Sequence, residues 1–221
     1  MEQMTVTELY TLKETIASEI FAGVTYPWEV LPKIGAFIVK LGSTLPETEY
    51  EKIGEDIWVA KSAKVAATAS IHGPRSSEKR RRSDIVHLSG EMLSWEKELL
   101  WEIPQSLKNV ILFNKVQVPH YNYVGDSILG YKSHMGAGAV TSNVKSDKSL
   151  VKVKAGEKTI ETGLKKFGAM LGDEVEVGCG SVLNPGSVIG SHTNIYPLSM
   201  VRGVIPAGSI YKKQGEIVAK Q

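Results

Sequence analysis

Aliphatic residues recur every six positions along the C-terminal half of the chain. The series is Leu171, Val177, Leu183, Ile189, Ile195 and Val201, and glycine directly follows the first, second and fourth of them. A period of six excludes a helix, because 3.6 residues per turn would scatter these side chains around the axis. A simple strand has a period of two and does not return so regularly to an aliphatic–glycine pair. A short fixed repeat instead predicts a solenoid whose units are each one short strand plus a turn.

Three such units close one triangular coil, and successive coils stack. The pattern therefore predicts an all-β fold, a left-handed parallel β-helix, over residues 57–211. The same phase is expected in the first coil and in the coils before the long series, with one five-residue step, at Val59, Val65, Ile71, Val118, Val124, Leu129 and Met135. Glycine or another small residue fills most of the turns, where the backbone is crowded or left-handed.

Three segments lie outside the repeat. Residues 1–56 form a predicted helical N-terminal segment, with one helix over 5–23, capped by Thr5 or Thr7, and a second short helix within 28–42. Residues 142–166 are charged and predict a loop or short hairpin projecting from a coil corner. Residues 212–221 form a predicted C-terminal tail.

Residues 75–107 break the phase and carry an isolated basic run at 79–82. Three interpretations are open. The run binds phosphate or nucleic acid, the stretch is an inserted helix, or it is translated out of frame between two compensating insertions or deletions. Back-translation of 83–107 in a frame shifted by one base gives IRHCAFIRGNAIVGKGAVVGNSTEL, which contains a hexapeptide unit with its glycines in phase. Resequencing the gene and its relatives tests this hypothesis, because an unchanged segment in relatives would end it.

Composition narrows the functional classes. The chain has 221 residues and a formal net charge of +2, so its charge favours neither nucleic acid nor an acidic partner. The single cysteine, Cys179, excludes an internal disulfide and is typical of a reducing cytoplasm. The N-terminus lacks the basic and apolar regions of a secretory signal, and no apolar run is long enough to cross a membrane. We therefore expect a cytoplasmic protein without a membrane or nucleic-acid partner.

One motif is more specific than the repeat. It follows the pattern H-x-x-Y-x-G-D and then G-A-G-x-x-T-x-N, as His120, Tyr123, Gly125, Asp126, Gly136, Ala137, Gly138, Thr141 and Asn143. Residues 57–74 and 108–211 thereby resemble the acetyltransferase domain of the bifunctional bacterial N-acetylglucosamine-1-phosphate uridyltransferase/glucosamine-1-phosphate acetyltransferase family. They are more similar still to its short UDP-N-acetylglucosamine pyrophosphorylase-related members. Nothing here resembles the uridyltransferase half, and residues 1–56 are too short to hold one.

The resemblance implies that His120 is a general base. Acetyl transfer to an amine requires one, because an ammonium group must lose a proton before it attacks a thioester, and imidazole titrates near neutral pH. Without the family motif, a structural histidine after Pro119 at a coil corner would be the favoured interpretation of His120. Acyl transfer also needs donors for the developing oxyanion, and backbone N–H groups near Gly136 and Ala137 are candidates.

The resemblance also implies binding residues. Lys108, Tyr123 and Lys166 match the family's sugar-phosphate contacts, and lysines suit a phosphate dianion. His134 stands where the family has a substrate-binding asparagine, and Gly90 stands where it has a phosphate-binding arginine, which the shifted frame would restore. The acetyl-CoA side corresponds to Ala137, Asn143, Cys179 and Pro197. No metal site is expected, and Cys179 is interpreted as a small residue near the cofactor rather than a nucleophile.

These observations predict an acetyl-CoA-dependent N-acetyltransferase acting on an amino-sugar phosphate such as glucosamine 1-phosphate, in nucleotide-sugar metabolism. The family resemblance further implies a homotrimer with sites between subunits. Two alternatives remain open. One is a non-catalytic or decayed hexapeptide-repeat protein that binds sugar phosphates or nucleotide sugars, and the other is an enzyme with a different acyl acceptor.

Overall fold

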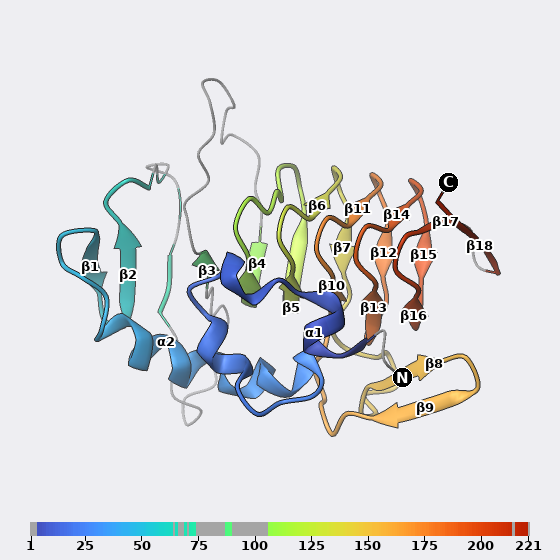
Figure 1. Ribbon diagram of the computed structural model, residues 1–221, viewed down its shortest axis with the longest axis horizontal. Helices are drawn as coiled ribbons and strands as arrows, with labels where there is room; N and C mark the ends of the chain where they lie inside the picture. Colours follow the sequence, from blue (N-terminus) through green and yellow to red (C-terminus); the bar gives the residue numbers. More distant parts are fainter. Residues whose placement is uncertain are drawn as a thin grey trace.

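Parallel strands stack coil upon coil along the long axis of the protein (Figure 1). The computed structural model describes residues 4–63, 65, 69, 71–73, 87–89, 106–213 and 215–220. The coils have three faces, and the predicted left-handed parallel β-helix is confirmed. Within the described part of the chain, no helix is long and apolar enough to cross a membrane.

Each face is a parallel ladder whose rungs come from successive coils. The first face contains β3 (His87–Ser89), β4 (Ser106–Leu112), β5 (Tyr123–Leu129), β10 (Ala169–Leu171), β13 (Ser187–Ile189) and β16 (Val204–Ile205). The second contains β6 (His134–Met135), β11 (Glu176–Val177), β14 (Asn194–Ile195) and β17 (Ser209–Lys213). The third contains β7 (Val140–Thr141), β12 (Val182–Leu183) and β15 (Met200–Val201), and β7 pairs with the start of β5 through Tyr123.

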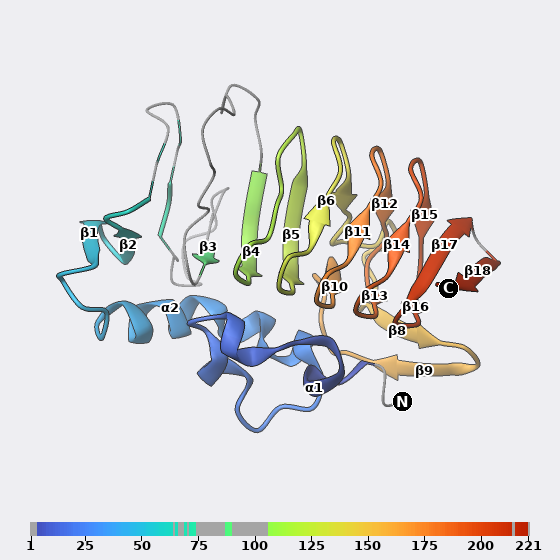
Figure 2. The ribbon, with the colours of Figure 1, turned by 45° about the horizontal axis from the view of Figure 1, so that its top comes forward.

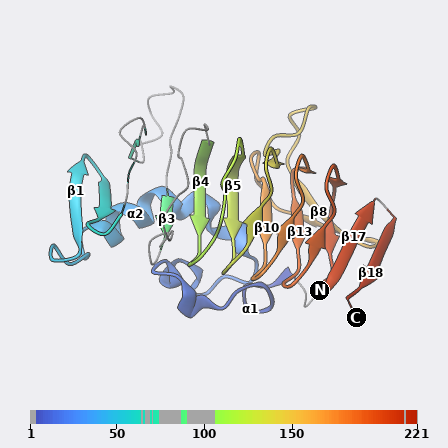
Figure 3. The ribbon, with the colours of Figure 1, turned by 90° about the horizontal axis from the view of Figure 1, so that it is seen from above.

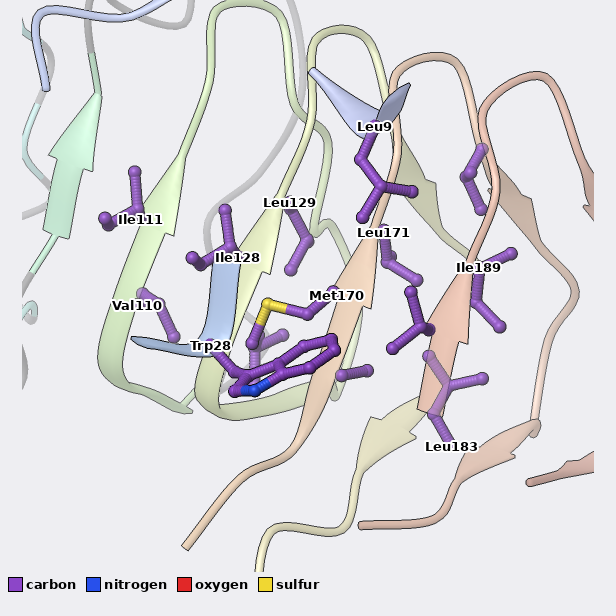
Figure 4. Packing of buried hydrophobic residues seen from close by; sticks show 14 of the residues in the cluster. Leu9, Trp28, Val110, Ile111, Ile128, Leu129, Met170, Leu171, Leu183 and Ile189 are labelled. Atoms are coloured by element: carbon purple, nitrogen blue, oxygen red, sulfur yellow. The ribbon is translucent and has the colours of Figure 1, made fainter. Parts of the chain in front are cut away.

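The aliphatic residues that recur every six positions form the core of the β-helix, as predicted. All six aliphatic residues from Leu171 to Val201 are at most 3% exposed, and Val124, Leu129 and Met135 are fully buried. In-register pairing explains this burial, because Leu171 lies on Leu129 and beneath Ile189, while Val177 lies on Met135 and beneath Ile195. Figure 4 shows Leu129, Leu171 and Ile189 pointing into the shared interior.

The N-terminal residues 4–42, here called the strap, run along the outside of the first face (Figure 2). They contain α1 (Val6–Leu9), three 3₁₀ helices (Leu12–Glu14, Ser18–Phe21 and Pro27–Lys33) and α2 (Ile34–Gly42). Trp28 is 2% exposed, stacks on Phe167 at 5.6 Å between ring centroids and lies beside Met170 of β10 (Figure 4). The strap therefore covers the outer surface of the first face.

The prediction of one helix over residues 5–23 is wrong, because α1 ends at Leu9. The backbone of Tyr10 is extended, and the strap bonds there to the β-helix instead of to itself. The Leu9 carbonyl accepts the Asp173 N–H at 2.9 Å, and the Thr11 N–H donates to the Asp173 carboxylate at 2.7 Å. Thr5 lies at the start of α1 but makes no side-chain cap. Tertiary hydrogen bonds thus replace the helical ones.

Residues 57–60 also differ from the prediction. They form β2 (Ile57–Ala60), which pairs antiparallel with β1 (Tyr50–Gly54) as a separate two-stranded sheet and not as a rung of a coil. Val65 and Ile71 are 48% and 36% exposed, so they do not line a core. The apparent phase at Val59, Val65 and Ile71 arises from a hairpin and the connection after it. Of residues 75–107, only 87–89 and 106–107 are described, so the frame-shift hypothesis lies mostly outside the described residues.

Two further hairpins decorate the β-helix (Figure 3). The insertion at 142–166 contains β8 (Lys152–Ala155) and β9 (Lys158–Glu161), and Val151 and Val153 are fully buried. It packs along the coils, because a Cβ added at Gly186 or Gly203 would lie within 3 Å of backbone carbonyls of β8. At the C-terminal end, β18 (Glu216–Ala219) pairs antiparallel with β17 and covers the edge of the last coil.

Candidate active site

The functional candidates lie at two of the three corners of the β-helix. The histidine corner joins the second face to the third and consists of the turns 119–122, 136–139, 178–181 and 196–199. The asparagine corner joins the third face to the first and includes 125–126 and 142–143. The remaining strap corner joins the first face to the second and contains Asp173. The third face separates the first two corners.

At the histidine corner, four candidate residues stack in register. The Gly138 N–H donates to the carbonyl of His120 at 2.8 Å, the Gly180 N–H to that of Ala137 at 2.8 Å, and the Leu198 N–H to that of Cys179 at 2.9 Å. The strand register agrees, since His134 pairs with Gln117, Glu176 with His134, and Asn194 with Glu176. His120, Ala137, Cys179 and Pro197 therefore form one column, about 14 Å long at about 4.8 Å per coil.

The backbone of His120 is fixed from both sides. Its N–H donates to Asn122 Oδ1 at 2.9 Å, and Asn122 is buried and donates its amide to the carbonyls of Gly136 and Ala139. The imidazole itself is half-buried. Ala137, Cys179 and Pro197 are exposed, so the column presents an open surface beside the histidine. The sequence predicted these four residues, and the structure brings them together.

The backbone N–H groups at this corner narrow the oxyanion prediction. The Gly136 N–H donates to Val177 O at 2.7 Å, and the Gly138 N–H donates to His120 O, so both are used within the coils. Among the described residues, the Ala137 N–H between them has no hydrogen-bond acceptor. Of the two predicted donors, Ala137 is therefore the one whose geometry leaves it available to a ligand.

At the asparagine corner lie four more candidates. Lys108 of β4 is in register with Gly125 of β5, and Tyr123 begins β5. The Tyr123 hydroxyl accepts a hydrogen bond from Asn143 Nδ2 at 3.2 Å. Lys166 is exposed and directly precedes Phe167, whose N–H donates to Asn143 O at 2.9 Å. Asn143, assigned to acetyl-CoA by the family resemblance, lies beside the predicted sugar-phosphate residues and outside the column of the other acetyl-CoA residues.

The asparagine corner also contains a buried carboxylate that the sequence left without a role. Asp126 is 6% exposed and accepts hydrogen bonds from Asn109 Nδ2 at 2.8 Å and Asn143 Nδ2 at 2.5 Å. Burial raises the pKa of the Tyr123 phenol, and the negative charge of Asp126 raises it further, against the opposing hydrogen bond from Asn143. Asn109 is the functional candidate that sequence reasoning missed, since its only signal is adjacency to Lys108.

His134 lies apart from both corners, on the second face. Its Nδ1 is 2.9 Å from Glu176 Oε2 of the coil above, and both side chains are partly exposed. His134 pairs with Gln117 of the coil below. Gln117 precedes His120 by three residues, so at most about 11 Å of chain separates Gln117 from His120. Among the described residues, no three His, Cys, Asp or Glu side chains gather as a metal site requires.

The triangular coils built from hexapeptide units, with a histidine at one corner, define a hexapeptide-repeat left-handed β-helix. No protein-family model matches the chain. It is 33% identical over 106 residues to the bifunctional sugar-1-phosphate nucleotidylyltransferase/acetyltransferase of Sulfurisphaera tokodaii, which covers 48% of this chain and 26% of that protein. It is also 33% identical over 114 residues to the bifunctional protein GlmU of Methanococcus aeolicus, covering 52% of this chain and 28% of that one. These relatives confirm the resemblance found in the sequence.

The chain spans only about a quarter of the length of these relatives. Among solved structures, the acetyltransferase domain of PglB from Neisseria gonorrhoeae in complex with acetyl coenzyme A is similar, with a TM-score of 0.31 and 16% identity. That similarity covers 50% of this chain and 48% of the PglB domain.

Proposed function

We propose that this protein is an acetyl-CoA-dependent N-acetyltransferase that acts on an amino-sugar phosphate, such as glucosamine 1-phosphate. The observation that carries the proposal is the column of His120, Ala137, Cys179 and Pro197, which aligns a histidine with the residues assigned to acetyl-CoA. The relative from Sulfurisphaera tokodaii carries both sugar-1-phosphate and acetyltransferase in its name, which supports the same class of reaction.

The chemistry requires one proton acceptor and one oxyanion donor. The imidazole of His120 takes a proton from the ammonium group of the sugar, and the freed nitrogen attacks the thioester carbonyl carbon. The Ala137 N–H donates to the oxyanion as the C–N bond forms. The C–S bond then breaks, and the second proton lost by the nitrogen goes to the CoA thiolate. The products are an N-acetyl sugar phosphate and CoA.

The asparagine corner supplies the proposed sugar-phosphate site. Lys108 and Lys166 bring two positive charges to it, from a strand and from the end of the inserted loop. The Tyr123 phenol stays protonated and can donate to a phosphate or sugar oxygen, because its pKa is raised. Tyr123 lies three residues from His120, at most about 11 Å of chain, so a small sugar phosphate can reach from one corner to the other.

We further propose that the protein assembles as a homotrimer through its third face. The strap covers the first face, and charged or polar side chains (Gln117, His134, Glu176, Asn194) line the outside of the second. The third face and the histidine corner instead expose large apolar side chains, at 36–85% exposure: Tyr121, Val182, Tyr196, Leu198 and Met200. Large apolar side chains exposed on one side of the molecule favour a protein interface, and a neighbour packed on them would close the open side of the site.

A thiol-release assay with acetyl-CoA and a panel of amino-sugar phosphates tests the proposal. We expect CoA release with at least one amino-sugar phosphate, and His120→Ala should lower kcat by about 10²–10⁴-fold. His192→Ala is the matched control, since His192 is an exposed histidine that pairs with Glu174 at the strap corner and should leave kcat unchanged. Failure of every amino-sugar phosphate and nucleotide-linked amino sugar would favour a non-catalytic binding protein.

The same panel of amino-sugar phosphates also tests the role of His134. The family has an asparagine there, whereas this chain holds an imidazole against Glu176. We expect His134→Asn to change the ratio of kcat/KM values between glucosamine 1-phosphate and the other acceptors. Equal effects on all acceptors would remove His134 from the proposed substrate site.

A further inference from the structure

Three amide and carboxylate side chains stack at the asparagine corner, one from each of three successive coils. Asn109, Asp126 and Asn143 are spaced by 17 residues, and each oxygen of the Asp126 carboxylate accepts from one of the two asparagines. Asn109 also donates to Leu31 O of the strap at 3.4 Å. The Asp126 carboxylate is therefore hydrogen-bonded on both sides, by Asn109 of one neighbouring coil and Asn143 of the other. Asn109 also bonds to the strap.

The stack determines which way the Asn143 amide faces. An amide nitrogen has two hydrogens, and here one goes to Asp126 and the other to the Tyr123 hydroxyl. The amide oxygen cannot face a carboxylate, because two acceptors repel. Asn143 can thus meet a ligand only through Oδ1, as an acceptor. Tyr123 accepts from Asn143, so its own O–H remains to donate.

Gly125 provides the space for this arrangement. A Cβ built at Gly125 would lie 2.5 Å from the Tyr123 hydroxyl oxygen and 2.8 Å from Asn143 Nδ2. The glycine–aspartate pair after Tyr123 therefore has a physical explanation. Glycine lets the phenol and the amide meet, and the aspartate fixes the amide.

We propose that Asp126 is a positioning residue, which orients Asn143 as a hydrogen-bond acceptor and Tyr123 as a donor at the point where acyl donor and sugar phosphate meet. This inference rests on the proposed acetyltransferase function. Asn143 Oδ1 accepts an amide N–H of the pantetheine arm of acetyl-CoA, and Tyr123 donates to an oxygen of the sugar phosphate. The corner thereby selects ligands by the polarity of their groups as well as by charge.

The test compares Asp126→Asn with Asp173→Asn. Asp173 is also a buried carboxylate at a coil corner, but it accepts only backbone N–H groups, from Thr11 and Tyr131. In Asp126→Asn we expect KM for glucosamine 1-phosphate to rise about tenfold, the loss of one charge-assisted hydrogen bond, with kcat changed less. In Asp173→Asn we expect KM to stay within twofold of the native value.

A second readout separates positioning from a structural role. The titration of Tyr123, followed by NMR of ¹³C-labelled tyrosine and assigned with Tyr123→Phe, should move to lower pH in Asp126→Asn and stay fixed in Asp173→Asn. Asp126 on β5 is the charged group that raises the pKa of the Tyr123 phenol, and Asp126→Asn removes that charge. A folded Asp126→Asn protein with native titration and native KM would overturn the proposal.

Asn109→Ala keeps the proposal testable if Asp126→Asn does not fold. It releases one carboxylate oxygen without touching Asn143, so KM for the sugar phosphate should rise severalfold, and an unchanged KM would contradict the positioning role. The phenol titration does not depend on turnover. If the native protein transfers no acetyl group but the titration moves, the positioning stands and the proposed function falls. If the native protein transfers acetyl groups but Asp126→Asn behaves like Asp173→Asn, the proposed function stands and the positioning role of Asp126 falls.

Discussion

Two buried aspartates stand at different corners of this β-helix, and their partners differ. Asp173 is 8% exposed and accepts the backbone N–H groups of Thr11 and Tyr131 at 2.7 and 2.8 Å. Asp126 is 6% exposed and accepts the side-chain amides of Asn109 and Asn143. A carboxylate bound to backbone ties two segments together, whereas one bound to side chains orients groups that can meet a ligand. The number of hydrogen bonds is the same, and the partner decides the role.

The largest expected effect on stability comes from Asp173. Replacing it by alanine leaves two N–H groups without a charged acceptor, one of them joining the strap to the β-helix. Hydrogen bonds to charged groups contribute about 1.5–3 kcal/mol each, so the loss of two in Asp173→Ala should lower the free energy of unfolding by about 3–6 kcal/mol. Denaturant unfolding measures this value. The neighbouring exposed Glu174→Ala should change it by less than about 0.5 kcal/mol, and a similar loss in both variants would deny Asp173 its anchoring role.

Gly125→Ala tests the other corner through shape rather than charge. The added Cβ would clash with the Tyr123 hydroxyl and the Asn143 amide, at a cost of about 1–3 kcal/mol in stability. Because it displaces both side chains, it should also weaken glucosamine 1-phosphate binding about tenfold, the equivalent of one hydrogen bond to a charged group. Isothermal titration calorimetry gives the binding constant.

Gly156→Ala is the matched control for that substitution. Gly156 has a φ of +59° at the tip of the β8–β9 hairpin and no atom within 4 Å of an added Cβ. Alanine there costs about 1–2 kcal/mol of backbone strain and should leave binding unchanged. Equal binding by the two variants would show that the Tyr123–Asn143 contact does not form part of the ligand site.

The smallest expected effect is on the pH dependence of stability, and it links each aspartate to a tyrosine. Burial raises the pKa of Tyr10 well above its ordinary value of 10.0, and Asp173 raises it further; Tyr123 is raised by burial and Asp126, less strongly. A phenol whose pKa is raised on folding contributes stability fully below about pH 10, and that stability is lost as pH rises through the folded-state pKa.

The unfolding free energy should therefore fall between about pH 9 and pH 11, with a slope of at most about 1.4 kcal/mol per pH unit for each phenol. Tyr10→Phe should flatten this fall more than Tyr123→Phe, because the pKa shift of Tyr10 is larger. Denaturant midpoints at the two pH values decide the order. The opposite order would mean that folding raises the pKa of Tyr123, beside Asp126, more than the pKa of Tyr10, beside Asp173.

The sequence predicted the core because it follows from a local repeat, whereas the family resemblance named His120, Ala137, Cys179 and Pro197 and the structure brings them into one column. Leu171 to Val201 recur at a fixed step of six residues. The four column residues instead lie 17, 42 and 18 residues apart, because one coil contains the inserted loop, so their alignment is visible only in the fold. The Asn109–Asp126–Asn143 stack depends on the same regularity across 17 residues, yet nothing near Asn109 in the sequence indicates its partner.

Predictions failed where tertiary contacts overrode local signals. The apolar spacing of Leu9, Leu12, Ile16 and Ile20 fits a helix, but the hydrogen bonds of Leu9 and Thr11 to Asp173 draw the chain into an extended segment. Val59 has the right phase for a rung, but β2 finds an antiparallel partner in β1. A period of three units is too short to distinguish a coil from a hairpin.

The most direct test of the account uses the single cysteine of the chain. Cys179 is exposed and lies two coils from His120 in the column assigned to acetyl-CoA. The rate of its alkylation by a small maleimide should fall severalfold at saturating acetyl-CoA, and inorganic phosphate alone should leave it unchanged. An alkylation rate that acetyl-CoA does not alter would contradict the placement of the acyl donor along the histidine corner.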